Sequence, residues 1–156
     1  MDADVVIPEP ARFGALRLAW LQLRSRGRLQ VGAGVRIGRG ADVRIARRAR
    51  VELGDGCYLG EGSRVEAVDG TLRVGARALV GARAFLIGHS DLTLGADAVI
   101  GDFAAVGVLS APGEVGAVSI GEGARIAAHA TVASGASVPA GGEVGSYQGL
   151  VFTPKP

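Results

Sequence analysis

Residues 120–150 decide the fold, because an aliphatic residue recurs at every sixth position of this stretch. In sixes, the sequence is IGEGAR (120–125), IAAHAT (126–131), VASGAS (132–137), VPAGGE (138–143) and VGSYQG (144–149), followed by Leu150. The fifth position is small in most sextets, at Ala124, Ala130, Ala136 and Gly142. A six-residue period fits neither the turn of an α-helix nor the alternation of a long strand. It is typical of a solenoid of short strands and tight corners, with one hexapeptide on each flat face.

The same period extends towards the N-terminus through a recurring tetrad, aliphatic–x–aliphatic–Gly, after which the sextets restart. The tetrads occupy residues 29–32, 51–54, 72–75, 92–95 and 118–121, at intervals of 22, 21, 20 and 26 residues. Three sextets account for 18 residues, so each of these turns carries a few additional residues at one corner. We therefore predict an all-β, three-sided prism of about six turns over residues 29–150, followed by a tail at 151–156.

The corner residues support this prediction. Glycine, which adopts a positive φ without steric cost, occupies the fourth position of a sextet at 34, 40, 56, 62, 123, 135 and 141. Asp97, His129 and His89 are expected in the same corner position, because Asp and His tolerate it better than most other residues. Cys57 falls in the small fifth position, so we interpret it as a buried structural thiol rather than a nucleophile.

The interval of 26 residues interrupts the period at residues 109–117, LSAPGEVGA. This stretch predicts a loop that leaves the prism, and projecting loops on rigid scaffolds commonly carry functional sites. It contains no histidine or cysteine, and its one acid is Glu114.

Residues 1–28 precede the repeats, and we interpret them as an irregular leader followed by a helix over 10–28. Phe13, Leu16, Trp20 and Leu23 form an apolar stripe at helical spacing, and Gly27 is a plausible stop. The preferred interpretation is a cap, because an open solenoid end exposes unpaired strand edges. The alternative is a basic amphipathic helix that contacts a membrane surface.

Composition and charge exclude several classes. Glycine contributes 26 of 156 residues but proline only 6, and there is no Gly-X-Y period, which excludes collagen; the single cysteine excludes an internal disulfide framework. No run of about 18 apolar residues and no signal peptide is visible, so a cytoplasmic protein is expected. Residues 1–50 carry eleven arginines against four acids. Nucleic-acid binding is not expected, because no known module and no interleaved aromatic residues accompany this charge.

The sextet pattern, aliphatic-Gly-x-x-small-x, resembles that of the hexapeptide-repeat acyltransferases over about residues 29–150. The local likeness is greatest to sugar O-acetyltransferases of the maltose and galactoside type, whose relatives have a His-bearing turn similar to residues 86–95, LIGHSDLTLG. The resemblance implies a left-handed parallel β-helix, a homotrimer, acetyl-CoA or another acyl-CoA as co-substrate, and a sugar-like hydroxyl as acceptor. It also implies a histidine that acts as general base.

The chain has two histidines, expected at different edges of the prism. His89 is the candidate base, with Asp91 to orient it, and His129 is the alternative. Related γ-class carbonic anhydrases bind zinc with three histidines, so no metal site is expected. For the pantetheine arm of CoA, the resemblance suggests a smooth column of small residues with an arginine near the phosphates, for which the candidates are Gly121, Ala127, Ala133 and Arg125.

A second functional hypothesis stays open. The sugar O-acetyltransferases usually carry a His-rich segment one turn after the His-bearing turn, and the matching positions here are Val108, Leu109, Ser110 and Ala111. The alternative is therefore a catalytically degenerate, trimeric β-helix that serves as a scaffold or assembly protein.

Overall fold

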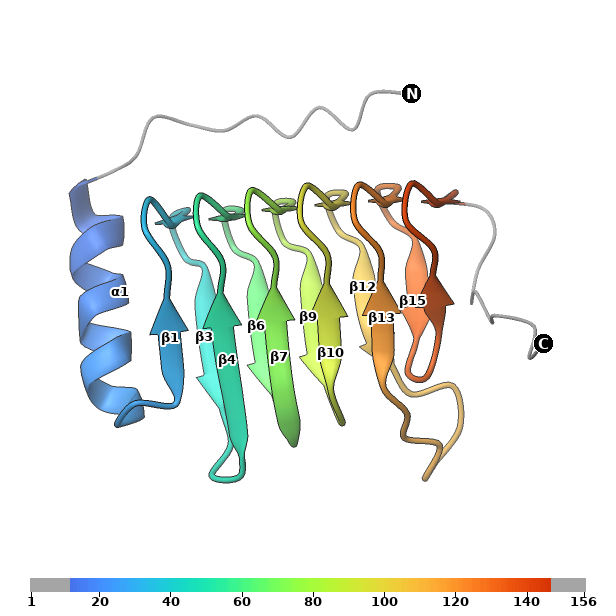
Figure 1. Ribbon diagram of the computed structural model, residues 1–156, viewed down its shortest axis with the longest axis horizontal. Helices are drawn as coiled ribbons and strands as arrows, with labels where there is room; N and C mark the ends of the chain where they lie inside the picture. Colours follow the sequence, from blue (N-terminus) through green and yellow to red (C-terminus); the bar gives the residue numbers. More distant parts are fainter. Residues whose placement is uncertain (1–11, 147–156) are drawn as a thin grey trace.

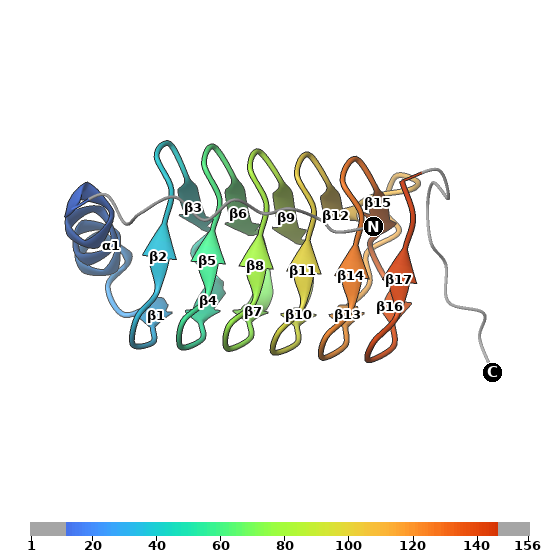
Figure 2. The same cartoon turned by 90° about the horizontal axis from the view of Figure 1, so that it is seen from above.

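The chain forms a three-sided prism of about six stacked turns, a left-handed parallel β-helix with one helix at its N-terminal end (Figures 1 and 2). The computed structural model describes the backbone of residues 12–146 and the side chains from residue 15 onward. The predicted leader, residues 147–150 at the end of the predicted prism and the predicted tail at 151–156 lie outside the described residues. The predicted fold class is confirmed.

Three parallel sheets form the walls of the prism. The first wall comprises β1 (Leu29–Val31), β4 (Ala49–Leu53), β7 (Gly70–Val74), β10 (Leu92–Leu94), β13 (Val118–Ile120) and β16 (Ser137–Val138). The second wall comprises β2 (Arg36–Ile37), β5 (Tyr58–Leu59), β8 (Leu79–Val80), β11 (Val99–Ile100), β14 (Arg125–Ile126) and β17 (Glu143–Val144). The third wall comprises β3 (Asp42–Ile45), β6 (Arg64–Ala67), β9 (Phe85–Gly88), β12 (Ala105–Val108) and β15 (Thr131–Ala133).

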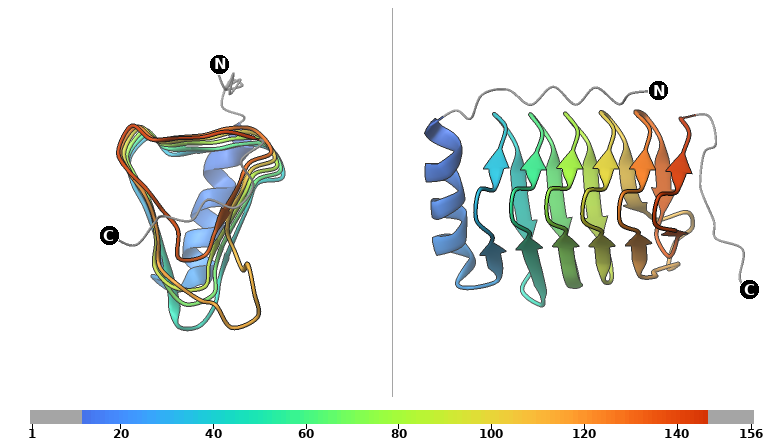
Figure 3. Two further views of the ribbon diagram at one scale, coloured as in Figure 1. Left: turned by 90° about the vertical axis from the view of Figure 1, so that its right-hand side faces the viewer. Right: turned by 45° about the horizontal axis from the view of Figure 1, so that its top comes forward.

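We name the edges by the walls they join. The chain passes from the first to the second wall at the first edge, from the second to the third wall at the second edge, and from the third back to the first wall at the third edge. Figure 3 shows, looking along the prism, that the turns superimpose closely except near the third edge. The additional residues of each longer turn lie there, between the strands of the third and first walls.

Aliphatic side chains from all three walls fill the interior in each turn. The residue that opens each sextet is buried through the middle turns, as at 53, 59 and 65, 74, 80 and 86, 94, 100 and 106, and 120, 126 and 132. Strand pairing stacks these residues in register, for example Val65 with Leu86. Such columns bury apolar surface continuously along the prism, which is the main stabilising contribution in a solenoid.

The tetrad glycines allow the turns to approach one another. A Cβ added at Gly54 would lie 2.7 Å from the backbone nitrogen of Ala76 in the next turn.

Aspartates join neighbouring turns on their outer surface. The carboxylate of Asp55 accepts a hydrogen bond from the Ala33 amide at 2.8 Å, and that of Asp102 accepts one from the Ala82 amide at 2.8 Å.

The predicted corner glycines all have positive φ angles, and so do Asp97 and His129. The same prediction is wrong for His89, which is absent from the residues with positive φ among 12–146. His89 lies in a longer corner at the third edge, so its backbone need not make the tight left-handed turn. Three further non-glycine residues at prism corners have positive φ angles that were not predicted, namely Arg77, Arg83 and Phe103; Arg26, after helix α1, also has one.

Helix α1 (Arg12–Ser25) packs across the N-terminal end of the prism against β1 and β2, as the cap interpretation predicts. The apolar stripe identified from the sequence is not the face that packs on the prism. Leu18 and Ser25 are buried, whereas Leu16, Trp20 and Leu23 are exposed; the side chain of Phe13 lies outside the described ones. The helix carries leucines on opposite sides, so their spacing alone does not identify the packed side. Within residues 12–146, no helix combines the length and apolar character needed to span a bilayer.

The loop at 109–117 leaves the prism at the third edge, as predicted (Figure 3). A β-bulge precedes it: the pairing of β12 with β15 shifts register between Val106 and Val108, and Gly107 has a φ of 87°. The hydroxyl of Ser134 fastens the far end of the loop, because it accepts a hydrogen bond from the Gly116 amide and donates one to the Gly116 carbonyl, each at 3.1 Å.

Candidate functional site

The third edge brings His89 and the loop at 109–117 onto neighbouring turns. His89 lies in the connection from β9 to β10, and the loop connects β12 to β13. Because β9 pairs with β12 and β10 pairs with β13, the loop follows the histidine-bearing corner one turn along the prism. The His89 side chain is half-buried. This edge therefore combines an imidazole, a projecting loop and a bulge, a feature that is over-represented beside active sites.

Asp91 holds neighbouring turns together. Its carboxylate accepts a hydrogen bond from the Thr71 amide at 2.9 Å in the preceding turn, and its backbone carbonyl accepts one from the Val118 amide at 2.9 Å in the following turn. Among residues 12–146 the structure records no hydrogen bond between Asp91 and His89. Asp91 therefore joins neighbouring turns, as Asp55 and Asp102 do at the other edges. Its role as an orienting group for His89 stays a prediction.

The loop at 109–117 presents both polar and apolar groups. The Ser110 hydroxyl donates a hydrogen bond to the Glu114 carboxylate at 3.0 Å, while Leu109 and Val115 are exposed. The loop therefore offers one hydroxyl, one carboxylate and two aliphatic side chains next to the histidine-bearing corner. This mixture suits contact with a polyhydroxylated ring, which has hydroxyl groups and apolar C–H surfaces.

His129 lies at the second edge, so the two histidines are at different edges, as predicted. Its imidazole is stacked on the Phe103 ring, with centroids 5.0 Å apart and planes 2° apart. The Arg83 guanidinium lies 5.8 Å from the centroid of that phenyl ring. These three side chains form an exposed ladder on successive turns. The ladder was not predicted from the sequence, although its spacings of 20 and 26 residues equal the corresponding tetrad intervals.

The candidate CoA residues do not form one column. Gly121 follows β13 of the first wall, Ala127 follows β14 of the second wall, and Ala133 ends β15 of the third wall. The three residues therefore belong to three different walls. A step of six residues advances by one wall, whereas a column needs a step of one full turn. Arg125 is exposed on the second wall, where its neighbours in register are Val99 and Glu143.

A shallow groove lies along the first wall instead, with a volume of about 510 Å³. Its lining includes the tetrad glycines Gly32, Gly54, Gly75 and Gly95 and also Arg73, which forms an ion pair with Glu52 at 2.8 Å. β10, the strand that follows His89, contributes Thr93 and Leu94 to the lining. Sequence analysis missed this groove, although the repeated tetrad glycines mark its position.

Cys57 is fully buried at the first edge, as predicted. Burial raises the pKa of its thiol to about 12, and the nearby Asp55 carboxylate acts in the same direction. The thiol therefore stays protonated at neutral pH, which agrees with a structural role. Within residues 12–146 no group of three or more His, Cys, Asp and Glu side chains is arranged to hold a metal ion.

No model of a known protein family matches the chain, and no curated protein matches it significantly in sequence. The functional interpretation therefore depends on the third edge and on the first-wall groove.

Proposed function

We propose that the protein is an acyltransferase that moves an acetyl or similar acyl group from an acyl-CoA to a hydroxyl of a sugar-like acceptor. The observation that supports this proposal most directly is the placement of His89 at the edge where the loop at 109–117 projects, one turn away. An acceptor held by the loop lies beside an imidazole at the end of the first wall.

His89 acts as general base in this proposal. Its neutral imidazole takes the proton of the acceptor hydroxyl as the hydroxyl oxygen attacks the thioester carbonyl carbon. A C–O bond forms and the C–S bond breaks, and the imidazolium returns the proton to the departing thiolate. The products are an O-acyl ester and CoA. Ser110 and Glu114, whose side chains are hydrogen-bonded to each other, supply polar contacts to the acceptor.

We assign the pantetheine arm of acyl-CoA to the first-wall groove rather than to Gly121, Ala127 and Ala133. The groove spans four turns, and β10 runs from the corner that carries His89 to the groove, which its Thr93 and Leu94 line. Arg73 at its rim offers a cation for the phosphates. The proposal includes a homotrimer, as the family resemblance implies, in which a neighbouring subunit covers the groove and completes the site; mass measurement in solution tests this part.

Two measurements test the catalytic proposal. Acetyl-CoA at millimolar concentration should raise the unfolding midpoint of the full chain, because a ligand that binds only the folded state stabilises it. His89→Ala should then lower turnover by roughly 10²–10⁴-fold, the range expected for loss of a general base, while the unfolding midpoint stays near that of the wild type. His129→Ala is the matched control and should retain wild-type turnover. Unchanged turnover in His89→Ala, or no midpoint shift with acetyl-CoA, contradicts the proposal.

A non-catalytic scaffold is the second candidate. It is favoured by the use of the Asp91 carboxylate to join turns, and by the absence of histidine from positions 108–111. A scaffold predicts no acetyl-CoA stabilisation and no dependence of any activity on His89, so the same two measurements separate the candidates.

A further inference from the structure

The cap helix α1 leaves one apolar face uncovered. Leu16, Trp20 and Leu23 have 70%, 54% and 81% of their surfaces exposed. At about 100° per residue these positions fall within a narrow arc of the helix. Because they lie side by side, the three side chains form a continuous apolar surface, which soluble proteins usually cover with a partner or a membrane.

The opposite side of α1 fixes this orientation. Leu18 is buried against the prism, and the Ser25 hydroxyl accepts a hydrogen bond from the Leu29 amide at 3.2 Å and donates one to the Gln22 carbonyl at 2.8 Å. Arg28 donates hydrogen bonds to the carbonyls of Ile45 and Ala46 at 3.0 and 2.6 Å. The helix is therefore held with Leu16 and Leu23 on its outer side and with Trp20 beside β3, where it is about half exposed.

The surroundings of this face are strongly basic. Residues 15–50 contain ten arginines and one acid, Asp42. That carboxylate is already paired, with Arg44 at 3.0 Å and with Arg17 at 4.0 Å. Arg17 and Arg24 flank the apolar face on the helix itself, and the remaining exposed cations lie at the same end of the prism. The charge is therefore complementary to an anionic surface rather than to another copy of this basic end.

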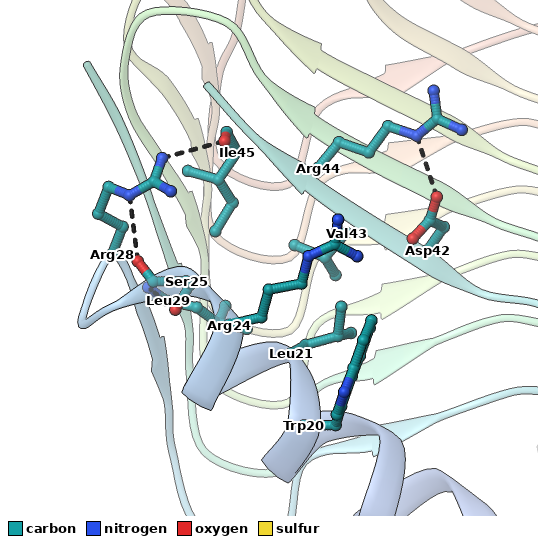
Figure 4. A pocket seen from close by; sticks show the side chains of 10 residues that line it. All are labelled: Trp20, Leu21, Arg24, Ser25, Arg28, Leu29, Asp42, Val43, Arg44 and Ile45. Carbon is teal, nitrogen blue, oxygen red and sulfur yellow. Dashed lines mark hydrogen bonds and ion pairs between the residues drawn. The ribbon is translucent and has the colours of Figure 1, made fainter. Parts of the chain in front are cut away.

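A hollow beside the helix extends the basic surface inward (Figure 4). It has a volume of about 550 Å³, lies between α1 and β3, and is lined by Trp20 and three arginines, Arg24, Arg28 and Arg44, and also by Asp42, which is paired with Arg44. The Arg24 guanidinium lies 5.1 Å from the centroid of the Trp20 ring. Guanidinium groups bind phosphate oxygens strongly, and tryptophan is enriched where headgroups meet acyl chains.

We propose that the outer face of α1 binds an anionic phospholipid bilayer. Leu16, Trp20 and Leu23 enter the boundary between headgroups and acyl chains, the flanking arginines contact the phosphates, and the hollow beside Trp20 receives a headgroup. The helix lies in the plane of the bilayer, and the prism stands on the surface by its N-terminal end. This inference does not depend on the acyltransferase proposal.

Trp20 is the only tryptophan of the chain, so its emission reports directly on this face. The full chain should sediment with vesicles of phosphatidylcholine and phosphatidylglycerol, with a blue shift of the emission. Binding to vesicles of phosphatidylcholine alone should be much weaker, and high salt should reduce binding to the anionic vesicles.

Substitutions separate the apolar and the charged contributions. The double variant Leu16→Ser, Leu23→Ser should weaken partitioning by more than about tenfold, whereas Val115→Ser, an exposed apolar residue of the distant loop, should bind like the wild type. Arg24→Gln should weaken binding by about fivefold; the control Arg64→Gln, exposed on the third wall, should have a smaller effect.

Three outcomes overturn the proposal. The first is equal binding of the wild type and the leucine double variant. The second is the same emission shift with inorganic phosphate in the absence of vesicles, which indicates a phosphate site rather than a membrane surface. The third is a smaller mass in solution for the leucine double variant than for the wild type, without vesicle binding by either, which indicates that this face joins two copies of the chain.

Discussion

The second and third edges of the prism differ in regularity. At the second edge every corner within residues 38–130 is tight, and residues with positive φ follow one another turn after turn, including Arg83, Phe103 and His129. At the third edge the connections differ in length, from residues 68–69 to 109–117. Regular corners keep the walls in register, because each corner packs against the corner of the next turn. The connections at the third edge can vary in length without disturbing the walls. This edge can therefore accommodate both the projecting loop and the corner that carries His89.

The largest expected effect comes from closing the space between regular turns. A Cβ at Gly60, which leads into the second edge, would lie 2.5 Å from the carbonyl carbon of Gly81. We therefore expect Gly60→Val to cost more than about 4 kcal/mol or to prevent folding. Gly113→Ala, in the third-edge loop, is the matched control: no neighbour lies within 4 Å of its added Cβ, and the strain of its positive φ should cost about 1 kcal/mol. Chemical denaturation measures both, and equal losses would remove the distinction between the edges.

A smaller effect should separate stacking from backbone strain within the second edge. Phe103→Ala removes the stacking with His129 and keeps a non-glycine residue at a φ of 61°. We expect it to destabilise the chain by about 1 kcal/mol. Phe103→Gly loses the same stacking but relieves the left-handed strain, so it should be more stable than Phe103→Ala. The reverse order in urea denaturation would show that the positive φ at residue 103 carries no strain that glycine relieves.

The smallest effect concerns the first edge, where Arg77 and Asp97 form an exposed bidentate pair at 2.9 and 3.0 Å. The hydrogen bond from Arg77 lowers the pKa of the Asp97 carboxyl below its ordinary value of 3.8. A lowered folded-state pKa contributes stability above the unfolded-state pKa, and this contribution is lost as the pH falls through the folded-state value. The stability difference between the wild type and Asp97→Asn should therefore shrink below about pH 4. Denaturation at pH 7 and pH 3 measures it, and a constant difference contradicts this role.

Sequence analysis predicted the prism well because the repeat is local. The first residue of each sextet faces inward. Ile120, Ile126 and Val132 could therefore be assigned to the interior from the period alone, without knowledge of any contact. The corner glycines followed from the same period. The candidate site was harder to predict from the sequence. The position of His89 at the third edge was predictable, but the hydrogen bond between Asp91 and Thr71 was not, because it joins residues 20 positions apart. The first-wall groove likewise arises only after the turns are stacked.

Sequence by itself determined the period, the inward-facing columns, the corners and the position of the loop, because each of these depends on a few adjacent residues. Only the tertiary structure decided which face of α1 packs on the prism and which residues of neighbouring turns line the first-wall groove. The orientation of a helix with leucines on two sides depends on the surface that it covers. Alignment between turns depends on the summed lengths of all intervening corners, which no single sextet specifies.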